Sequence, residues 1–393
     1  MKYKKHADTR TKHYINKDVY TASKERIHDA INQSDNQAVL CSGGKDSVLV
    51  AYLVSECYKE KGIQKPVNLI FMDEELINDD VINGIKELQK NRQFKVYWFS
   101  IPITCDMYNT GKSREYIQND PTREHVREAP ENSITLETLG LPSDTILTRY
   151  QIADIQAGLF AGRVCLFKGI RTEESLFRLT QVIRRKHSPH IGANTPKHFE
   201  CIPIYDWKEE DVFLYYYKKG IKYNPIYNKQ MWADAPLRVS TPTHTYNTDT
   251  YNKLRSIDPK LYTSIVEVFP DMAHADKYNN EVKQDKQGFQ EYPHTLQGLM
   301  QYIDDTYTDN KQHNLQAKKK ILWAYKRREQ NKTRPGSDKF GGYPLYYLFG
   351  IIQRGATMRH IIPREKPSWN CYKFEGYTQK DYIEDKNKRG TYT

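Results

Sequence analysis

The 393-residue sequence predicts an α/β protein with a parallel sheet covered by helices on both faces, followed by a mainly helical, basic C-terminal region. Three observations lead to this prediction. Short strands that are apolar throughout alternate with amphipathic stretches, as in sheets with two buried faces. Polar clusters follow three of the strands, at the place where such sheets bind ligands. Helical spacing returns near the C-terminus, where positive charge accumulates.

The elements of the first half follow in chain order. A polar lead-in over 1–35 contains a helix at about 18–31, and Leu49, Leu53 and Cys57 have the i, i+4, i+8 spacing of a second helix. Asp206 and Glu209 form a possible capping box for a later helix ending at Tyr217. The expected strands cover 38–41, 67–72, 95–101 and 163–168. Two further helices are expected over 79–90 and 147–160.

The second half is less regular. From about residue 231 the sequence is rich in Thr, Tyr, Asn and Pro without clear periodicity. Helical spacing then returns, which predicts helices over 295–307, 312–328 and 346–353. The expected organisation is a lead-in helix at 1–35, a main domain at 36–230, an extension at 231–293 and a basic, mainly helical region at 294–393.

Composition and cysteine usage narrow the class of protein. A chain with 38% hydrophobic and 28% charged residues, without an apolar run of about 18 residues, is typical of a globular enzyme rather than a membrane protein. The basic N-terminus is not followed by an apolar stretch, so we expect a cytoplasmic protein without membrane contact. The six cysteines are scattered, and their spacing predicts neither a zinc site nor an iron–sulfur cluster.

Charge is distributed unevenly along the chain. Residues 311–393 contain 19 of the 60 Lys and Arg residues but only 7 of the 49 Asp and Glu residues, a net charge of +12. The first 310 residues therefore carry a net charge of −1. A basic segment on a neutral body is typical of a protein that contacts a polyanion, so nucleic acid is a candidate partner. The alternative is a solvated, lysine-rich surface.

The segment from Ser42 to Ser47, with the sequence SGGKDS, carries the strongest functional signal. It follows an apolar strand and opens an amphipathic helix. Gly43 and Gly44 let the backbone approach an anion, and the helix N-terminus directs its amides at the same place. The serine hydroxyls can donate to phosphate oxygens and Lys45 adds a positive charge. Asp46 is a candidate ligand for Mg²⁺.

Further candidates follow the other strands. Asp73 could orient a ribose or a base or share the metal, although a plain turn carboxylate is an equal alternative. Arg171 follows a strand end and is expected to contact phosphate or sulfate. A helix capped by Thr172 would let Arg178 face the same way, although an ordinary Glu174–Arg178 ion pair is an open alternative.

The chain resembles the phosphoadenosine phosphosulfate (PAPS) reductase-like family of the PP-loop adenine nucleotide alpha-hydrolase superfamily. The resemblance rests on SGGKDS and on three later stretches, which are Gly169-Ile170-Arg171 with Glu174, Ser175 and Arg178, then PIYDW at 203–207, then YNPIY at 223–227. It covers roughly residues 20 to 230. It implies a Rossmann-like (HUP-type) sheet and an adenine nucleotide whose phosphates lie on Ser42–Ser47, with Gly169, Arg171 and Arg178 nearby. It also implies Mg²⁺ where the ligand is ATP.

The departures from the family pattern guide the functional prediction. Sulfonucleotide reductases act through a cysteine in a C-terminal E-C-G-x-H signature, which this sequence lacks. The intact loop is typical of ATP-using relatives, in which an acceptor attacks the α-phosphorus and pyrophosphate leaves. We therefore expect an enzyme that adenylylates an unidentified acceptor, with Lys45, Asp46 and Arg171 as candidate catalytic residues and a protein partner as a candidate source of the acceptor. Two alternatives stay open: a reductase with a non-standard thiol such as Cys371, and a non-catalytic nucleotide sensor that binds DNA.

Overall fold

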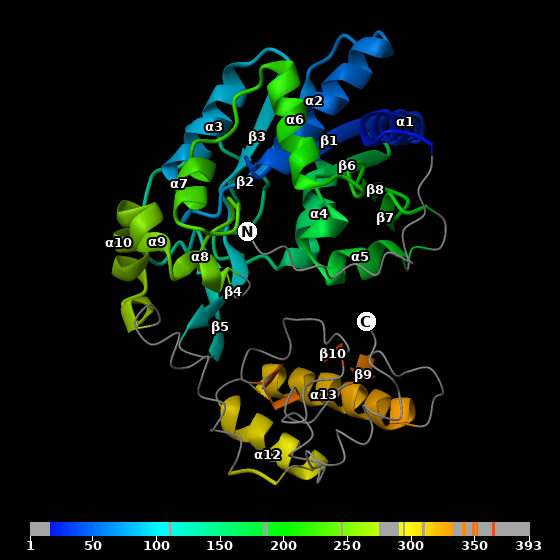
Figure 1. Ribbon diagram of the computed structural model, residues 1–393. Coiled ribbons are helices and arrows are strands. Elements are labelled where there is room, and N and C mark those ends of the chain that lie inside the picture. Colours follow the sequence, from blue (N-terminus) through cyan, green and yellow to red (C-terminus); the bar gives the residue numbers. More distant parts are fainter. Residues whose placement is uncertain are drawn as a thin grey trace. The chain divides into compact units, whose positions relative to one another are not determined.

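The computed structural model describes most of the first 332 residues and a few short stretches beyond them. The described residues are 16–109, 112–183, 185, 188–244, 247–274, 291–293, 295–308, 311–332, 340–342, 348–349, 351–352 and 364–365. The chain divides into two compact units, and Figure 1 shows their elements. The first unit comprises residues 1–105 and 115–268, and the second comprises 106–114 and 269–393.

A six-stranded sheet forms the centre of the first unit, with the spatial order β3-β2-β1-β6-β8-β7 (Figure 1). Neighbouring strands run parallel except β7 and β8. The chain moves outward from β1 to β2 and β3 and then returns to the other side of β1 as β6. A reversal of this kind opens a crevice beyond the strand ends. The strands are β1 Asn36–Leu40, β2 Val67–Met72, β3 Phe94–Phe99, β6 Val164–Lys168, β7 Ile191–Asn194 and β8 His198–Cys201.

Up to residue 268, the described part of the chain also contains ten helices of four or more residues and one separate hairpin. The hairpin strands are β4 Ile103–Asn109 and β5 Lys112–Gln118. The longer helices are α1 Val19–Asn32, α2 Lys45–Glu60, α3 Asp79–Lys90, α4 Arg149–Gly158, α5 Leu176–Ile183 and α6 Glu209–Lys219. The later helices of the unit are α7 Ile226–Trp232, α8 Thr248–Tyr251, α9 Leu254–Ile257 and α10 Pro259–Val268.

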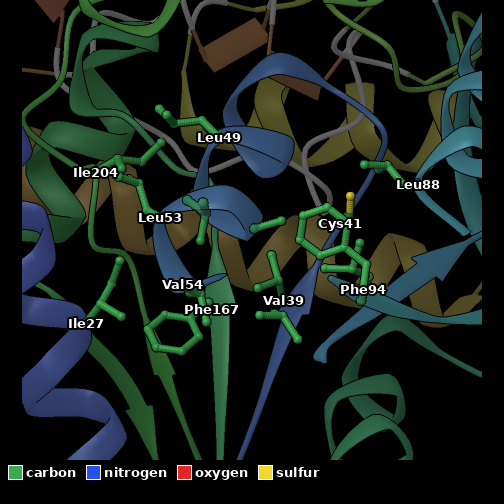
Figure 2. Packing of buried hydrophobic residues seen from close by; sticks show 14 of the residues in the cluster. Ile27, Val39, Cys41, Leu49, Leu53, Val54, Leu88, Phe94, Phe167 and Ile204 are labelled. Atoms are coloured by element: carbon green, nitrogen blue, oxygen red, sulfur yellow. The ribbon is translucent and has the colours of Figure 1, made fainter. Parts of the chain in front are cut away.

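Both faces of the central strands are buried, as the apolar strand sequences predict. Val39 of β1 and Phe167 of β6 pack with Leu53 of α2 in one core cluster (Figure 2). Their sequence neighbours Ala38 and Leu166 point to the opposite face, because successive strand residues alternate, and both are 0% exposed. The prediction of a mostly parallel α/β sheet flanked by helices is thus confirmed.

The second unit contains a small helical core. Helices α12 Leu296–Thr306 and α13 Lys311–Lys332 pack together around buried apolar residues that include Leu299 and Ile321. This agrees with the helical C-terminal region that the sequence predicts. Two short strands, β9 Phe340–Gly342 and β10 Arg364–Glu365, pair antiparallel. Of the helix expected over 346–353, the four described residues, 348–349 and 351–352, are helical. In the described part of the chain, no helix is both long and apolar enough to cross a membrane.

Asp206 and Trp207 form hydrogen bonds that hold α1 against the segment before α6. The guanidinium of Arg26 pairs with both carboxylate oxygens of Asp206 at 2.7 and 2.6 Å. Because this carboxylate is engaged by α1, it does not cap α6, whose N-cap is Lys208. The expected capping box at Asp206 and Glu209 is therefore wrong. The indole N–H of Trp207 donates to the hydroxyl of Ser23 at 2.6 Å.

Replacing Trp207 by phenylalanine should lower the free energy of unfolding by about 2 kcal/mol, because it removes this buried hydrogen bond and leaves a space where the larger ring packed. Urea unfolding at pH 7 measures the effect. Trp232→Phe is the control, since Trp232 is 92% exposed and its replacement should change stability by less than about 0.5 kcal/mol. Equal effects of the two substitutions would contradict the role given to Trp207.

Candidate functional site

The SGGKDS loop joins β1 to α2 at the point where the strand order reverses. Gly43 has φ +75°, a conformation that favours glycine, and a Cβ there would lie 2.9 Å from Cγ1 of Val81. Gly44 is the N-cap of α2, and a Cβ on it would lie 2.9 Å from Cγ2 of Val239. Both positions therefore require glycine, and the loop backbone is held between α3 and the segment around Val239.

Gly169 lies directly against this loop, although 120 or more residues separate them in the sequence. A Cβ on Gly169 would lie 2.6 Å from the carbonyl carbon of Asp46 and 2.6 Å from the amide nitrogen of Ser47. These are backbone atoms of the first turn of α2, which cannot move aside as a side chain can. The end of β6 and the start of α2 are thus in backbone contact, and a side chain at Gly169 would separate them.

Hydroxyl groups surround the start of α2. The Ser42 and Ser47 oxygens lie 3.3 Å apart, and Ser47 donates to the carbonyl of Gly44 at 3.0 Å. The first amide of the helix, on Lys45, donates to the hydroxyl of Tyr227 at 2.7 Å. The first amides of a helix have no partner within the helix, so this turn can bind anions or hydroxyl oxygens. Tyr227 belongs to the YNPIY motif, and the loop contact gives that motif a structural role.

Two buried cations flank Asp46. Nζ of Lys45 lies 3.2 Å from each of three oxygens. They are one carboxylate oxygen of Asp46, Oε1 of Glu209 and the carbonyl oxygen of Leu237. Nε of Arg171 donates to the other oxygen of Asp46 at 2.6 Å. Burial lowers the pKa of Arg171, but Asp46 and its other acidic neighbours outweigh burial and raise it. The structure therefore brings together the three candidate catalytic residues that the sequence predicts.

Arg178 does not share a helix face with Arg171. A short 3-10 turn, Thr172–Glu174, precedes α5, and Ser175 between them is extended. Thr172 uses both its amide and its hydroxyl to donate to the carbonyl of Tyr205, so it does not cap a helix. The predicted continuous helix from Thr172 is wrong. The side chain of Arg178 pairs with Glu174, which is the alternative that the sequence left open.

The polar residues after β2 divide between two roles. Asp73 is 5% exposed, and its carboxylate accepts from the indole of Trp98 at 3.1 Å and from the amide of Glu75 at 2.8 Å, and pairs with Arg127. Burial raises the pKa of Asp73, although Arg127 opposes this shift. These contacts join Asp73 to two side chains and one backbone amide, as expected of a structural turn carboxylate, and its contact with a ribose, a base or a metal stays a prediction.

Glu74, by contrast, faces a cavity of about 140 Å³ beside the loop. The ends of β1 and β2 give it apolar walls, and its polar lining comes from Ser42, Glu74, Gln156 and Ser240. Glu74 accepts from the amide of Thr241 at 2.7 Å. Burial raises the pKa of Glu74, but contacts that include His244 and Thr241 outweigh burial and hold it below its ordinary value.

Sequence reasoning missed several residues of this cavity. Glu74 belongs to the strand-end cluster that the sequence points to, but the pattern did not distinguish it from Asp73. Gln156 and Ser240 lie 114 and 198 residues beyond Ser42, in a helix and in the extension after residue 231. No local motif marks either of them, because their place in the cavity depends on the packing of α4 and of the extension against the sheet.

The basic region is described only in part. On α13, Lys318 pairs with Asp304 at 2.5 Å, and burial lowers the pKa of Lys320 to about 8. Trp323 is 49% exposed. Cys371, the thiol of the reductase alternative, lies outside the described residues, and nucleic-acid contact stays a prediction.

Comparisons with known proteins agree with the motifs. Residues 36–268 match the model of the phosphoadenosine phosphosulfate reductase domain. The uncharacterized protein YbdN of Escherichia coli K12 is 28% identical over 232 residues, which are 56% of this chain and 57% of that protein, so the chain matches less than two thirds of its relative.

Two solved structures show weaker likeness. A phosphoadenylyl-sulfate (PAPS) reductase from Candida auris, in a phosphate complex, has a TM-score of 0.32 and 14% identity, covering 53% of this chain and 84% of that chain. The U34-tRNA thiolase NcsA from Methanococcus maripaludis, with its 4Fe–4S cluster, has a TM-score of 0.29 and 15% identity, covering 66% of this chain and 82% of that one. Scores this low carry no weight for the fold or the function of this chain.

Proposed function

The chain belongs to the phosphoadenosine phosphosulfate reductase domain family, and from this premise we propose that it binds ATP with Mg²⁺ and cleaves the bond between the α- and β-phosphates to adenylylate an acceptor. The main support for this proposal is the glycine cradle at the start of α2, by which we mean Gly43, Gly44 and Gly169. At Gly43, Gly44 and Gly169 an added Cβ would meet another atom at 2.9 Å or less, so three separate positions keep the backbone bare around one helix N-terminus.

This cradle suits a chain of phosphates. Amides at a helix N-terminus bind phosphate oxygens, and they stabilise the charge that develops on pyrophosphate as it leaves. The hydroxyls of Ser42 and Ser47 lie at the same turn and can donate to those oxygens. Lys45 and Arg171 lie beside the turn, where both pair with Asp46, and their N–H groups can also donate to phosphate oxygens.

Asp46 supplies one carboxylate that suits Mg²⁺. When phosphate oxygens complete its shell, Mg²⁺ is held by only one or two carboxylates. Each oxygen of Asp46 accepts one hydrogen bond from a cation and keeps a further lone pair. The described residues contain one cluster of three side chains with metal-ligand atoms, at His28, Cys57 and Glu60, and Glu60 ends α2 far from Asp46. A bound Mg²⁺ would neutralise charge on the leaving pyrophosphate.

Sequence composition and charge indicate the class of acceptor. The missing E-C-G-x-H cysteine supports adenylyl transfer over sulfonucleotide reduction. The charge of +12 on residues 311–393 favours a polyanionic acceptor or partner such as nucleic acid. An acceptor delivered by a partner protein fits the same proposal.

The test is product analysis with a matched pair of glycine variants. Wild-type protein incubated with ATP and Mg²⁺ alone should bind ATP and release AMP and pyrophosphate rather than ADP and phosphate, because water then attacks the α-phosphorus in place of the acceptor. Gly43→Ala should weaken ATP binding about tenfold or more, measured by calorimetry, because it strains a positive φ and pushes Val81 out of place.

Gly62→Ala is the control. Gly62 has φ +69°, so alanine there suffers a similar backbone strain, but a Cβ at this position meets nothing within 4 Å. The control should be destabilised slightly and should bind ATP as the wild type does. ADP and phosphate as the products, or equal ATP binding by the two variants, would refute the proposed function.

A further inference from the structure

The cavity beside the loop is lined by a side-chain amide for which the described residues supply no hydrogen-bond partner. Gln156 of α4 lines the cavity and is 3% exposed. Within the described part of the chain, no residue forms a hydrogen bond with its side chain. Buried polar groups in native proteins are almost always hydrogen-bonded, since an unpaired one is costly. The amide of Gln156 is open to the cavity, so a polar group of a molecule that enters the cavity can pair with it.

The size and lining of the cavity indicate what kind of ligand group it takes. A cavity of about 140 Å³ with apolar walls holds one small ring system rather than a whole nucleotide. Ser42 belongs both to this cavity and to the loop, so a molecule with its phosphates on the loop can place its base here. Phe71 and Ile77 contribute to the apolar part of the wall, which suits a flat aromatic base.

The amide of a glutamine distinguishes between purines. It can accept from the 6-amino group of adenine and donate to the ring nitrogen N7 beside it, forming two hydrogen bonds at once. A 6-oxopurine such as hypoxanthine presents two acceptors at these positions, so the amide can pair with only one of them. The ionised carboxylate of Glu74 in the same cavity accepts but does not donate, and it would repel the 6-oxygen.

We propose that Gln156 reads the base of the bound nucleotide and selects 6-aminopurines over 6-oxopurines. This inference rests on the proposed function, because it assumes that a nucleotide has its phosphates on the loop. It adds a specificity-determining residue that no sequence motif contains.

The experiment compares ATP with inosine triphosphate (ITP), both with Mg²⁺, by calorimetry on the full chain. Wild-type protein should bind ATP about tenfold or more tightly than ITP. Gln156→Met keeps the length of an unbranched side chain but removes both hydrogen-bonding groups, and the ratio should fall to about threefold or less through weaker ATP binding. The melting temperature without ligand should stay level or rise, because the substitution removes an unpaired buried amide.

Gln89→Met is the matched control, since Gln89 is exposed on α3, and it should keep the wild-type ratio and melting temperature. Gln156→Leu repeats the test if methionine packs poorly. An unchanged ATP-to-ITP ratio in both Gln156 variants, or a sharp loss of stability without ligand, would overturn the role of Gln156 while the proposed function stands. Wild-type protein that binds neither nucleotide would overturn both.

Discussion

Gly169→Ala should destabilise the folded protein by about 3 kcal/mol and abolish measurable ATP binding. The new Cβ would lie 2.6 Å from two backbone atoms at the start of α2 and 2.7 Å from the carbonyl oxygen of Asp46. Overpacking against side chains typically costs about 1–3 kcal/mol, and backbone atoms relax less, so the upper end applies. Urea unfolding measures the loss of stability. Calorimetry with ATP and Mg²⁺ measures binding, at a temperature where circular dichroism shows that the variant is folded.

Gly158→Ala separates this effect from the general effect of a glycine substitution. Gly158 is the last residue of α4, and a Cβ there meets nothing within 4 Å. Alanine should leave ATP binding unchanged and stabilise the protein by up to about 1 kcal/mol, because it restricts the unfolded chain. A Gly169→Ala variant that binds ATP like the Gly158→Ala variant would show that the contact between β6 and α2 does not support the site.

Glu75→Gln should lower the free energy of unfolding by about 3 kcal/mol at pH 7. Glu75 is 2% exposed, and its carboxylate pairs with the guanidinium of Arg123 at 2.7 and 2.6 Å. It also accepts from the amides of Asn119 and Val126 at 3.0 and 3.1 Å. Removing one member of a buried ion pair costs about 3–5 kcal/mol, and the lower end applies because Arg123 is partly exposed.

This cost should depend on pH in a defined direction. Burial raises the pKa of Glu75, but Arg123 and the two amides outweigh burial and lower it below the ordinary value of 4.5. A carboxylate with a lowered folded pKa stabilises the protein above its unfolded pKa, and this stabilisation is lost as the pH falls through the folded value. The difference between wild type and Glu75→Gln should therefore be largest at pH 7 and shrink below about pH 4.5.

Glu87→Gln provides the control for this series. Glu87 is exposed on α3 and pairs with Lys90 at 2.7 Å on the surface, so its replacement should cost less than about 0.5 kcal/mol at any pH. Urea unfolding of the three proteins at pH 7, 5 and 4 gives the required differences. A cost for Glu75→Gln that grows as the pH falls would have the wrong sign and would reject this account.

Local patterns predicted much of the fold. The expected bounds of β2 and α3 agree with the structure. Both elements have a clear local pattern, since β2 is an apolar run and α3 is an amphipathic stretch. The hairpin β4–β5 and the strands β7 and β8 were not predicted. Ile191–Asn194 and His198–Cys201 are four residues each, too short for a clear apolar pattern.

The candidate site, like the fold, was predicted only in part. The SGGKDS motif and the strand before Gly169 were enough to predict a bare loop at Gly43 and Gly44 and candidate roles for Asp46 and Arg171, because such residues between a strand and a helix can be recognised locally. Three other features came from the three-dimensional arrangement alone: β6 lies beside β1, Arg171 reaches Asp46 across 125 residues, and Glu74 and Gln156 face one cavity. Such pairings depend on which strands neighbour each other and how helices pack over them, and a periodicity of two or 3.6 residues contains no information on that choice.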